Sequence, residues 1–207
     1  IDCRDPAFVR ALVFINRLQA HESNDAPWAD RLSRDGGFIY APSHNRDRLD
    51  EPQSYGSSAS GDPEAPGVPL RSYGSMTYAG FKSYVYAELD RDDPRVVAAL
   101  GWIRRNYTLE RNPGMAGEGR ELTGFFYYLM TFARALDAWG ERHIEGQDGE
   151  RHDWARDLMA RLVEMQDEDR SWVNPQSSRW MEDDRNLVTA YALIGLTHAL
   201  GWDADVG

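Results

Sequence analysis

The chain has little of what several classes of protein require. Among its 207 residues there is one cysteine, Cys3, which excludes an internal disulfide and a metal site built from several thiolates. No apolar run reaches the length that crosses a bilayer, so we expect no transmembrane segment. Lys and Arg number 23 against 34 Asp and Glu, a formal net charge of −11. So acidic a chain repels phosphate backbones, and we expect no nucleic-acid partner.

Motifs of common enzyme classes are missing as well. The sequence has no Gly-x-Ser-x-Gly elbow and no P-loop. No two of the five histidines have the spacing of metal ligands on one helix. These histidines are His21, His44, His143, His152 and His198. We therefore expect neither a metal site nor a cofactor.

What the chain does have is a repeated helix start. The segment from Asp5 to Leu12 returns as Asp93 to Leu100, and Phe14-Ile15 then matches Trp102-Ile103. Each copy begins with Asp at a helix N-cap and Pro at the first helical position, where the missing N–H costs nothing. Apolar residues follow at helical spacing. A repeated helix start indicates a repeated structural unit.

Each unit is predicted to pair two helices. The first helix of each pair carries charged residues on one face, whereas the second is apolar and aromatic around much of its circumference and is therefore buried on several sides. We expect outer helices at residues 5–19, 93–107 and 152–166, and inner helices at 73–89, 123–139 and 186–200. The sequence thus predicts an all-α fold of three helical hairpins.

We expect residues 1–207 to form one domain with an insertion. Residues 44–71 are rich in Pro and Ser and lack helical periodicity, and a loop of this length is usually functional or mobile. The chain begins with Ile1 directly before a helix cap, which indicates a processed product or a fragment, so the compartment is not indicated.

The turns between the paired helices carry a family resemblance. Gln19 followed by Asp35-Gly36-Gly37-Phe38, and Gln166 followed by Asp169-Arg170-Ser171-Trp172, resemble the QW repeats of the prenyltransferase and squalene-oxidase repeat family. This family includes terpenoid cyclases and protein prenyltransferase β subunits. The resemblance implies an α/α toroid, with inner helices around a cavity. Three hairpins would form half a toroid, so a second copy or further chain would complete the ring and cover its apolar edges.

The resemblance also indicates where an acid would act. Class II terpenoid cyclases protonate their substrate with the middle Asp of a D-x-D-D motif. Asp90-Arg91-Asp92-Asp93 fits the letters, but it follows an inner helix, and we interpret Asp93 as an N-cap. Glu182, Asp183 and Asp184 precede the third inner helix and are the candidate catalytic residues. The alternative is that they cap this helix.

By analogy with the toroid, a ligand would enter at the rim where loops lead into the inner helices. Aromatic rings there suit a cationic or apolar ligand, although Tyr and Trp could equally pack between helices. The candidate ligand-binding residues are Tyr73, Tyr78, Tyr127, Tyr128, Arg179 and Trp180.

Three functions remain open. The first is a squalene-cyclase-like protein, a diverged terpenoid cyclase acting on an apolar isoprenoid. The second is a non-catalytic toroid that binds a protein or a small apolar ligand in its concave face. The third is a carbohydrate-active α/α-barrel enzyme. An apolar cavity without clustered acids would favour the second, whereas carboxylates about 5–10 Å apart in a cleft would favour the third.

Overall fold

The computed structural model describes residues 5–40, 70–115, 119–147 and 149–203. The prediction of a mainly helical fold is confirmed, and each helix lies within a few residues of its expected place. The α-helices of the described residues are α1 (Pro6–Asn16), α2 (Gly74–Tyr86), α3 (Pro94–Arg105), α4 (Phe125–Trp139), α5 (Trp154–Glu164) and α6 (Arg185–Asp203). Two short 3₁₀ helices, η1 (Ala29–Arg31) and η3 (Arg179–Met181), lie in connecting segments.

The repeated helix starts form as the sequence predicts. The Asp5 carboxylate accepts a hydrogen bond from the Ala7 N–H at 2.7 Å, and Asp93 accepts one from the Arg95 N–H at 2.9 Å. In both helices Pro follows the cap. Each cap therefore satisfies an N–H that has no partner within its own helix. The interpretation of Asp93 as an N-cap is confirmed.

The third outer helix begins later than expected because a small sheet precedes it. Strands β1 (His143–Glu145) and β2 (Arg151–Asp153) pair antiparallel, with Ile144 opposite His152. His152 therefore belongs to a strand and not to the start of a helix. Asp153 ends β2 and caps α5, accepting a hydrogen bond from the Arg156 N–H at 3.2 Å.

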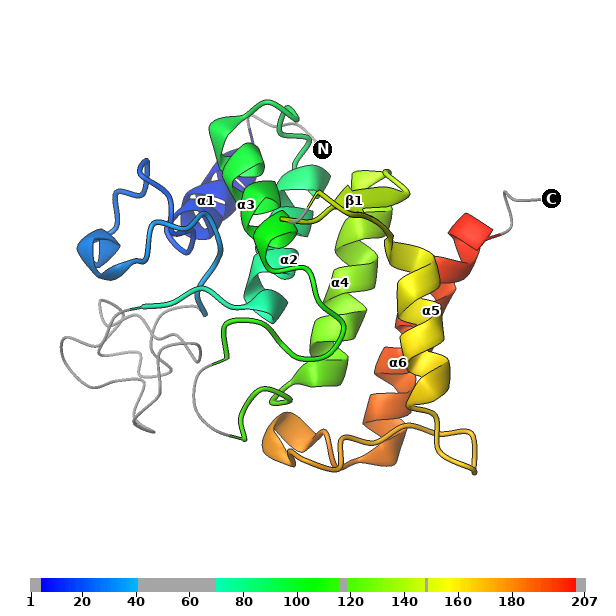
Figure 1. Cartoon of the computed structure of the whole chain (residues 1–207). Coiled ribbons are helices and arrows are strands. Elements are labelled where there is room, and N and C mark those ends of the chain that lie inside the picture. Colours follow the sequence, from blue (N-terminus) through cyan, green and yellow to red (C-terminus); the bar gives the residue numbers. More distant parts are fainter. Residues whose placement is uncertain (1–4, 41–69, 116–118, 148, 204–207) are drawn as a thin grey trace.

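The inner helices lie next to one another. Helix α4 packs against α2 on one side and α6 on the other, while α3 packs against α2, and α5 against α6 and α4 (Figure 1). Helix α1 contacts α2 at one end of this arrangement. The inner helices α2, α4 and α6 thus lie in a row, with α3 and α5 packed against them, and the arrangement in hairpins and its closure into a toroid stay predictions.

The core lies between the inner and outer helices. Tyr78, Phe81, Tyr128 and Phe132 of the inner helices and Trp154 of α5 are all fully buried in one cluster. The rings of Tyr78 and Phe132 have centroids 5.1 Å apart. Much of the aromatic content of the inner helices therefore fills the space between helices and stabilises their packing.

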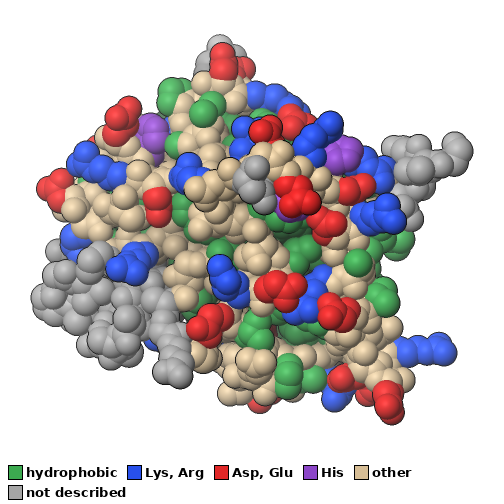
Figure 2. Space-filling model, in the orientation of Figure 1, with side chains coloured by type: hydrophobic (Ala, Val, Ile, Leu, Met, Phe, Trp, Pro, Cys, Tyr) green, Lys and Arg blue, Asp and Glu red, His purple; other side chains and the backbone are tan. Residues whose placement is uncertain are grey.

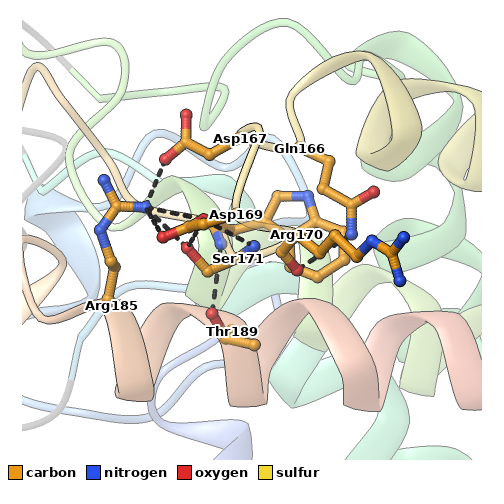
Figure 3. A network of polar contacts seen from close by, with 8 residues as sticks. Gln166, Asp167, Asp169, Arg170, Ser171, Arg185 and Thr189 are labelled. Atoms are coloured by element: carbon orange, nitrogen blue, oxygen red, sulfur yellow. Dashed lines mark hydrogen bonds and ion pairs between the residues drawn. The ribbon is translucent and has the colours of Figure 1, made fainter.

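The turns that carry the family resemblance share three hydrogen bonds. The Asp35 and Asp169 carboxylates accept from the N–H groups of Gly37 and Ser171 at 3.0 and 3.1 Å. The N–H groups of Phe38 and Trp172 donate to the hydroxyls of Thr77 and Thr189 on the following inner helices, at 3.0 and 3.1 Å. The side chains of Gln19 and Gln166 donate to the carbonyls of Gly36 and Arg170, both at 3.0 Å. Figure 3 shows the second of these turns, where Arg185 points toward Asp167 and Asp169.

The surface carries charges of both signs. On the face seen in Figure 2, acidic and basic side chains are interspersed, and apolar side chains are visible between them. No helix in the part of the chain that the structure describes is long and apolar enough to cross a membrane. The Pro- and Ser-rich insertion expected at 44–71 lies outside the described residues except for Leu70 and Arg71, and Cys3 and His44 lie outside them too.

Candidate functional site

A pocket of about 360 Å³ lies where the three inner helices begin. Helix α2 contributes its first turn, α4 its third residue and α6 its second turn, because α4 packs against both α2 and α6. A segment before the insertion and the 3₁₀ helix η3 complete the wall. The residues that line the pocket are Tyr40, Tyr73, Ser75, Met76, Tyr127, Trp180, Glu182 and Tyr191.

Glu182 is the acid among these lining residues, and it is fully buried. One carboxylate oxygen accepts from the Phe125 N–H at 2.8 Å and from the Asn174 side-chain amide at 2.7 Å. The other oxygen accepts from the Tyr127 N–H at 2.9 Å. Glu182 therefore caps α4 from a distant part of the chain, at a helix whose own N-cap residue, Gly124, has no side chain to do so.

The protonation of Glu182 is set by two opposing effects. Burial raises the pKa of the Glu182 carboxyl above its ordinary value, because the charged form loses its hydration. The hydrogen bonds from Tyr127, Asn174 and Phe125 favour the charged form and oppose this shift. The net direction is upward, so Glu182 binds a proton more readily than an exposed glutamate.

Trp180 reaches the pocket through an unusual backbone. Its φ is 58°, in the left-handed region that a tryptophan rarely adopts. The indole ring packs against Gly124, where an added Cβ would lie 2.7 Å from the Trp180 Cζ3 atom. Gly124 itself has a φ of 66°. The start of α4 thus depends on a glycine both for its backbone and for its contact with Trp180.

Two tyrosines from neighbouring inner helices meet in the pocket wall. The rings of Tyr127 on α4 and Tyr191 on α6 are 5.8 Å apart between centroids and inclined by 67°. Burial is the main cause that raises the pKa of both hydroxyls, and the nearby Glu182 also raises that of Tyr191. Both hydroxyls therefore remain neutral near pH 7 and can donate hydrogen bonds.

The structure brings some of the sequence-predicted residues together and separates others. Tyr73, Tyr127, Trp180 and Glu182 surround this one pocket. Tyr78 and Tyr128 are instead fully buried between the helices, and the Tyr128 hydroxyl donates to the Thr108 carbonyl at 2.7 Å.

The remaining predicted residues do not line the pocket. The Asp184 carboxylate accepts from the Asn186 N–H at 2.8 Å and so caps α6, while Asp183 is exposed. Arg179 is exposed and stacks on Trp180, with its guanidinium carbon 5.3 Å from the ring centroid. The contacts of Asp184 thus agree with the alternative that these acidic residues cap a helix.

Sequence reasoning missed Tyr40, Ser75, Met76 and Tyr191, which also line the pocket. For Tyr191 a signal existed, since it lies in the apolar and aromatic run of the third inner helix, as Tyr127 does in that of the second. Tyr40 gave no signal, because it follows the first turn and its approach to α2 depends on tertiary packing. In the described ranges, no three His, Cys, Asp or Glu side chains are grouped so that they could hold a metal ion.

Comparison of the chain with protein-family models, with curated proteins and with solved structures gives no match. Membership of the prenyltransferase and squalene-oxidase repeat family therefore remains a prediction from the two turns that share their residues and hydrogen bonds.

Proposed function

We propose that the chain binds a small, largely apolar molecule in the pocket at the start of the inner helices. The observation that supports this is the composition of the wall, in which five side chains are aromatic and the carboxylate of Glu182 is engaged in capping α4. A concave, mostly apolar site with a few polar groups is typical of small-molecule binding. The sequence analysis expected an apolar cavity without clustered acids in a non-catalytic protein that binds a ligand.

A terpenoid-cyclase activity is the second candidate. Its support is the raised pKa of Glu182, since a neutral carboxylic acid in an apolar pocket is what protonation of an alkene requires. Against it, the three N–H donors around Glu182 favour the ionised form, which holds no proton to give. A glycoside hydrolase would need two carboxyl groups flanking the scissile bond, and among the described lining residues Glu182 alone supplies one.

The binding proposal is tested by filling the pocket. The purified chain is titrated with geraniol, a neutral terpenoid alcohol, and binding is followed by calorimetry and by NMR. We expect saturable binding to the native chain and at least a tenfold loss in Met76→Trp, whose larger side chain occupies the cavity. Val97→Trp, at an exposed position of α3, is the matched control and should bind as the native chain does.

Absence of binding to the folded native chain, or equal binding by Met76→Trp, would contradict the proposal. Incubation with squalene and with prenyl diphosphates tests the second candidate separately. A cyclised product that is lost in Glu182→Gln would support a cyclase, and absence of any product from the folded chain would remove it.

A further inference from the structure

Aromatic side chains from separate segments of the chain line the pocket. Tyr40, Tyr73, Tyr127, Trp180 and Tyr191 come from five separate segments and converge on one cavity. The face of an aromatic ring carries partial negative charge and attracts a cation, most strongly when the cation is removed from water. Trp180 already takes part in such a contact, since the guanidinium carbon of Arg179 lies 5.3 Å from its ring centroid.

Among the described residues that line the pocket, the charged side chain is acidic. Glu182 places its carboxylate in the wall, and no Lys or Arg is among the described lining residues. Two arginines lie nearby without lining it. Burial raises the pKa of Tyr127 and the charge of Arg134 opposes this shift, while Arg179 stacks on Trp180. The described wall therefore combines aromatic side chains with one buried carboxylate, which would act on a ligand through its charge.

An anionic ligand finds its usual donors already engaged. Helix N-termini commonly bind phosphate or carboxylate through their first N–H groups. Here the Ser75 N–H of α2 donates to the Asn112 side chain at 3.2 Å, and the Phe125 and Tyr127 N–H groups of α4 donate to Glu182. At α6 the Asn186 N–H donates to Asp184 at 2.8 Å. The three helix starts around the pocket thus present N–H groups that protein oxygens satisfy.

We propose that the ligand of this pocket is an organic cation, an ammonium group surrounded by methyl or methylene carbons, held among the five aromatic rings and the Glu182 carboxylate. This inference rests on the proposed binding function and specifies its ligand class. Alkyl groups on the nitrogen fill the apolar space, while the charge, spread over these groups, faces the rings and the carboxylate. A compact ammonium without alkyl groups would lose more hydration than the pocket returns.

The test compares two probes of the same shape. Choline and 3,3-dimethylbutan-1-ol differ in that a positively charged nitrogen replaces a neutral carbon. The native chain is titrated with each probe, and the methyl and indole signals of the protein are followed by NMR. We expect choline to bind about tenfold more tightly than the alcohol, in the range that cation–π contacts supply.

Two variants separate charge recognition from loss of structure. Trp180→Leu removes a ring but keeps apolar bulk, so it should weaken choline binding several-fold more than binding of the alcohol. Met181→Leu, at the exposed neighbouring position, is the control and should leave the ratio of affinities unchanged. Glu182→Gln should also reduce the preference for choline, and circular dichroism verifies that the variant is folded.

The outcomes distinguish this inference from the proposed function. Equal or tighter binding of the neutral alcohol would overturn the cation preference and leave the binding pocket standing. If Trp180→Leu left the preference for choline unchanged, the inference would also be overturned, because the aromatic rings would then not be the groups that attract the charge. If neither probe nor geraniol binds the folded chain, both proposals fail.

Discussion

The turns at residues 19–38 and 166–172, which we call the first and third turns, have the same hydrogen bonds but different surroundings. Gln19 is fully buried, and its side chain donates to the carbonyls of Gly36 and Arg95 and accepts from the Tyr84 hydroxyl. Gln166 is exposed and donates to the carbonyl of Arg170. Arg95 belongs to α3, so Gln19 connects the first turn to α3, and we call this contact between Gln19, Gly36 and α3 the joint. Gln19 therefore stabilises the contact of the first turn with α3, whereas Gln166 stabilises only the third turn itself.

The residue after the aspartate of each turn shows the same difference. Gly36 and Arg170 both have positive φ, at 87° and 67°. A Cβ on Gly36 would lie 2.3 Å from the Ala98 carbonyl oxygen of α3, so the joint requires glycine. Arg170 is exposed, and its side chain needs no such space. A turn that packs against the next outer helix must be small, whereas a turn at an edge can carry a long side chain.

The first outer helix is an edge as well. Trp102 of α3 is 3% exposed, whereas Phe14, its counterpart in the repeated segment, is 47% exposed. The positions of α1 that match Ala98 and Gly101 hold Arg10 and Val13. Suppose that the third turn of one copy packed against α1 of a second copy. Arg170 would then stand where the joint has Gly36, and Arg10 where the joint has Ala98. The expected completion of a ring by the same joint has no support in these side chains.

The largest difference in the free energy of unfolding is expected between substitutions of Trp102, on α3, and Phe14, its counterpart on α1. Trp102→Ala should lower the free energy of unfolding by about 4 kcal/mol, because it opens a cavity in the core, whereas Phe14→Ala should cost about 1 kcal/mol. Denaturant unfolding measures both values. Equal losses would mean that Phe14 is buried by contacts outside the described residues.

Exchange of the turn residues tests the steric difference. Gly36→Arg should lower the free energy of unfolding by about 3 kcal/mol, through backbone strain and overlap with Ala98. Arg170→Gly should raise it by up to about 1 kcal/mol, since the left-handed backbone is no longer strained. Thermal and denaturant unfolding of both variants give the two numbers. A harmless Gly36→Arg would contradict the close contact with α3.

The two glutamines should differ in the same direction but by less. Gln19→Leu removes three hydrogen bonds and leaves buried partners unsatisfied, at a cost of about 2 kcal/mol. Gln166→Leu should change the stability by less than about 0.5 kcal/mol, as is usual at exposed positions. If Gln166→Leu were as costly as Gln19→Leu, Gln166 would have a buried partner like that of Gln19.

The smallest effect concerns pH at the third turn. Hydrogen bonds from Ser171, together with the charge of Arg185, hold the pKa of Asp169 below its ordinary value of 3.8. A lowered pKa stabilises the fold above pH 3.8, and this contribution is lost as the pH falls through the pKa of the folded state. The Ser171 amide signal in NMR should therefore titrate below pH 3.8. The same titration in Asp169→Asn would show that another group causes it.

The sequence predicted the helices because their signals are local. The Asp-Pro caps and the apolar periodicity act within one helix, and each helix begins and ends within a few residues of its expected place. Strands β1 and β2 have three residues each, too few for a period to be recognised. Their formation depends on pairing with each other and on the burial of Ile144.

The pocket was predicted only in part because its wall depends on tertiary packing. An inner helix is aromatic on several faces, and its own sequence does not say which ring meets a neighbouring helix and which meets a cavity. Tyr78 and Tyr128 therefore pack in the core, while Tyr127 lines the pocket. Glu182 precedes α6 in the sequence yet caps α4, a contact across 57 residues that no local pattern reveals.

The most direct test of the account is whether a ligand occupies this pocket. With methyl-labelled methionine, Met76 reports from the pocket wall and Met159, on α5, reports from elsewhere in the protein. During titration with choline, the Met76 methyl signal should shift and saturate while the Met159 signal stays in place. The proposed binding in this pocket would be contradicted if the Met76 signal did not move at high concentrations of choline and of geraniol, or if only the Met159 signal shifted.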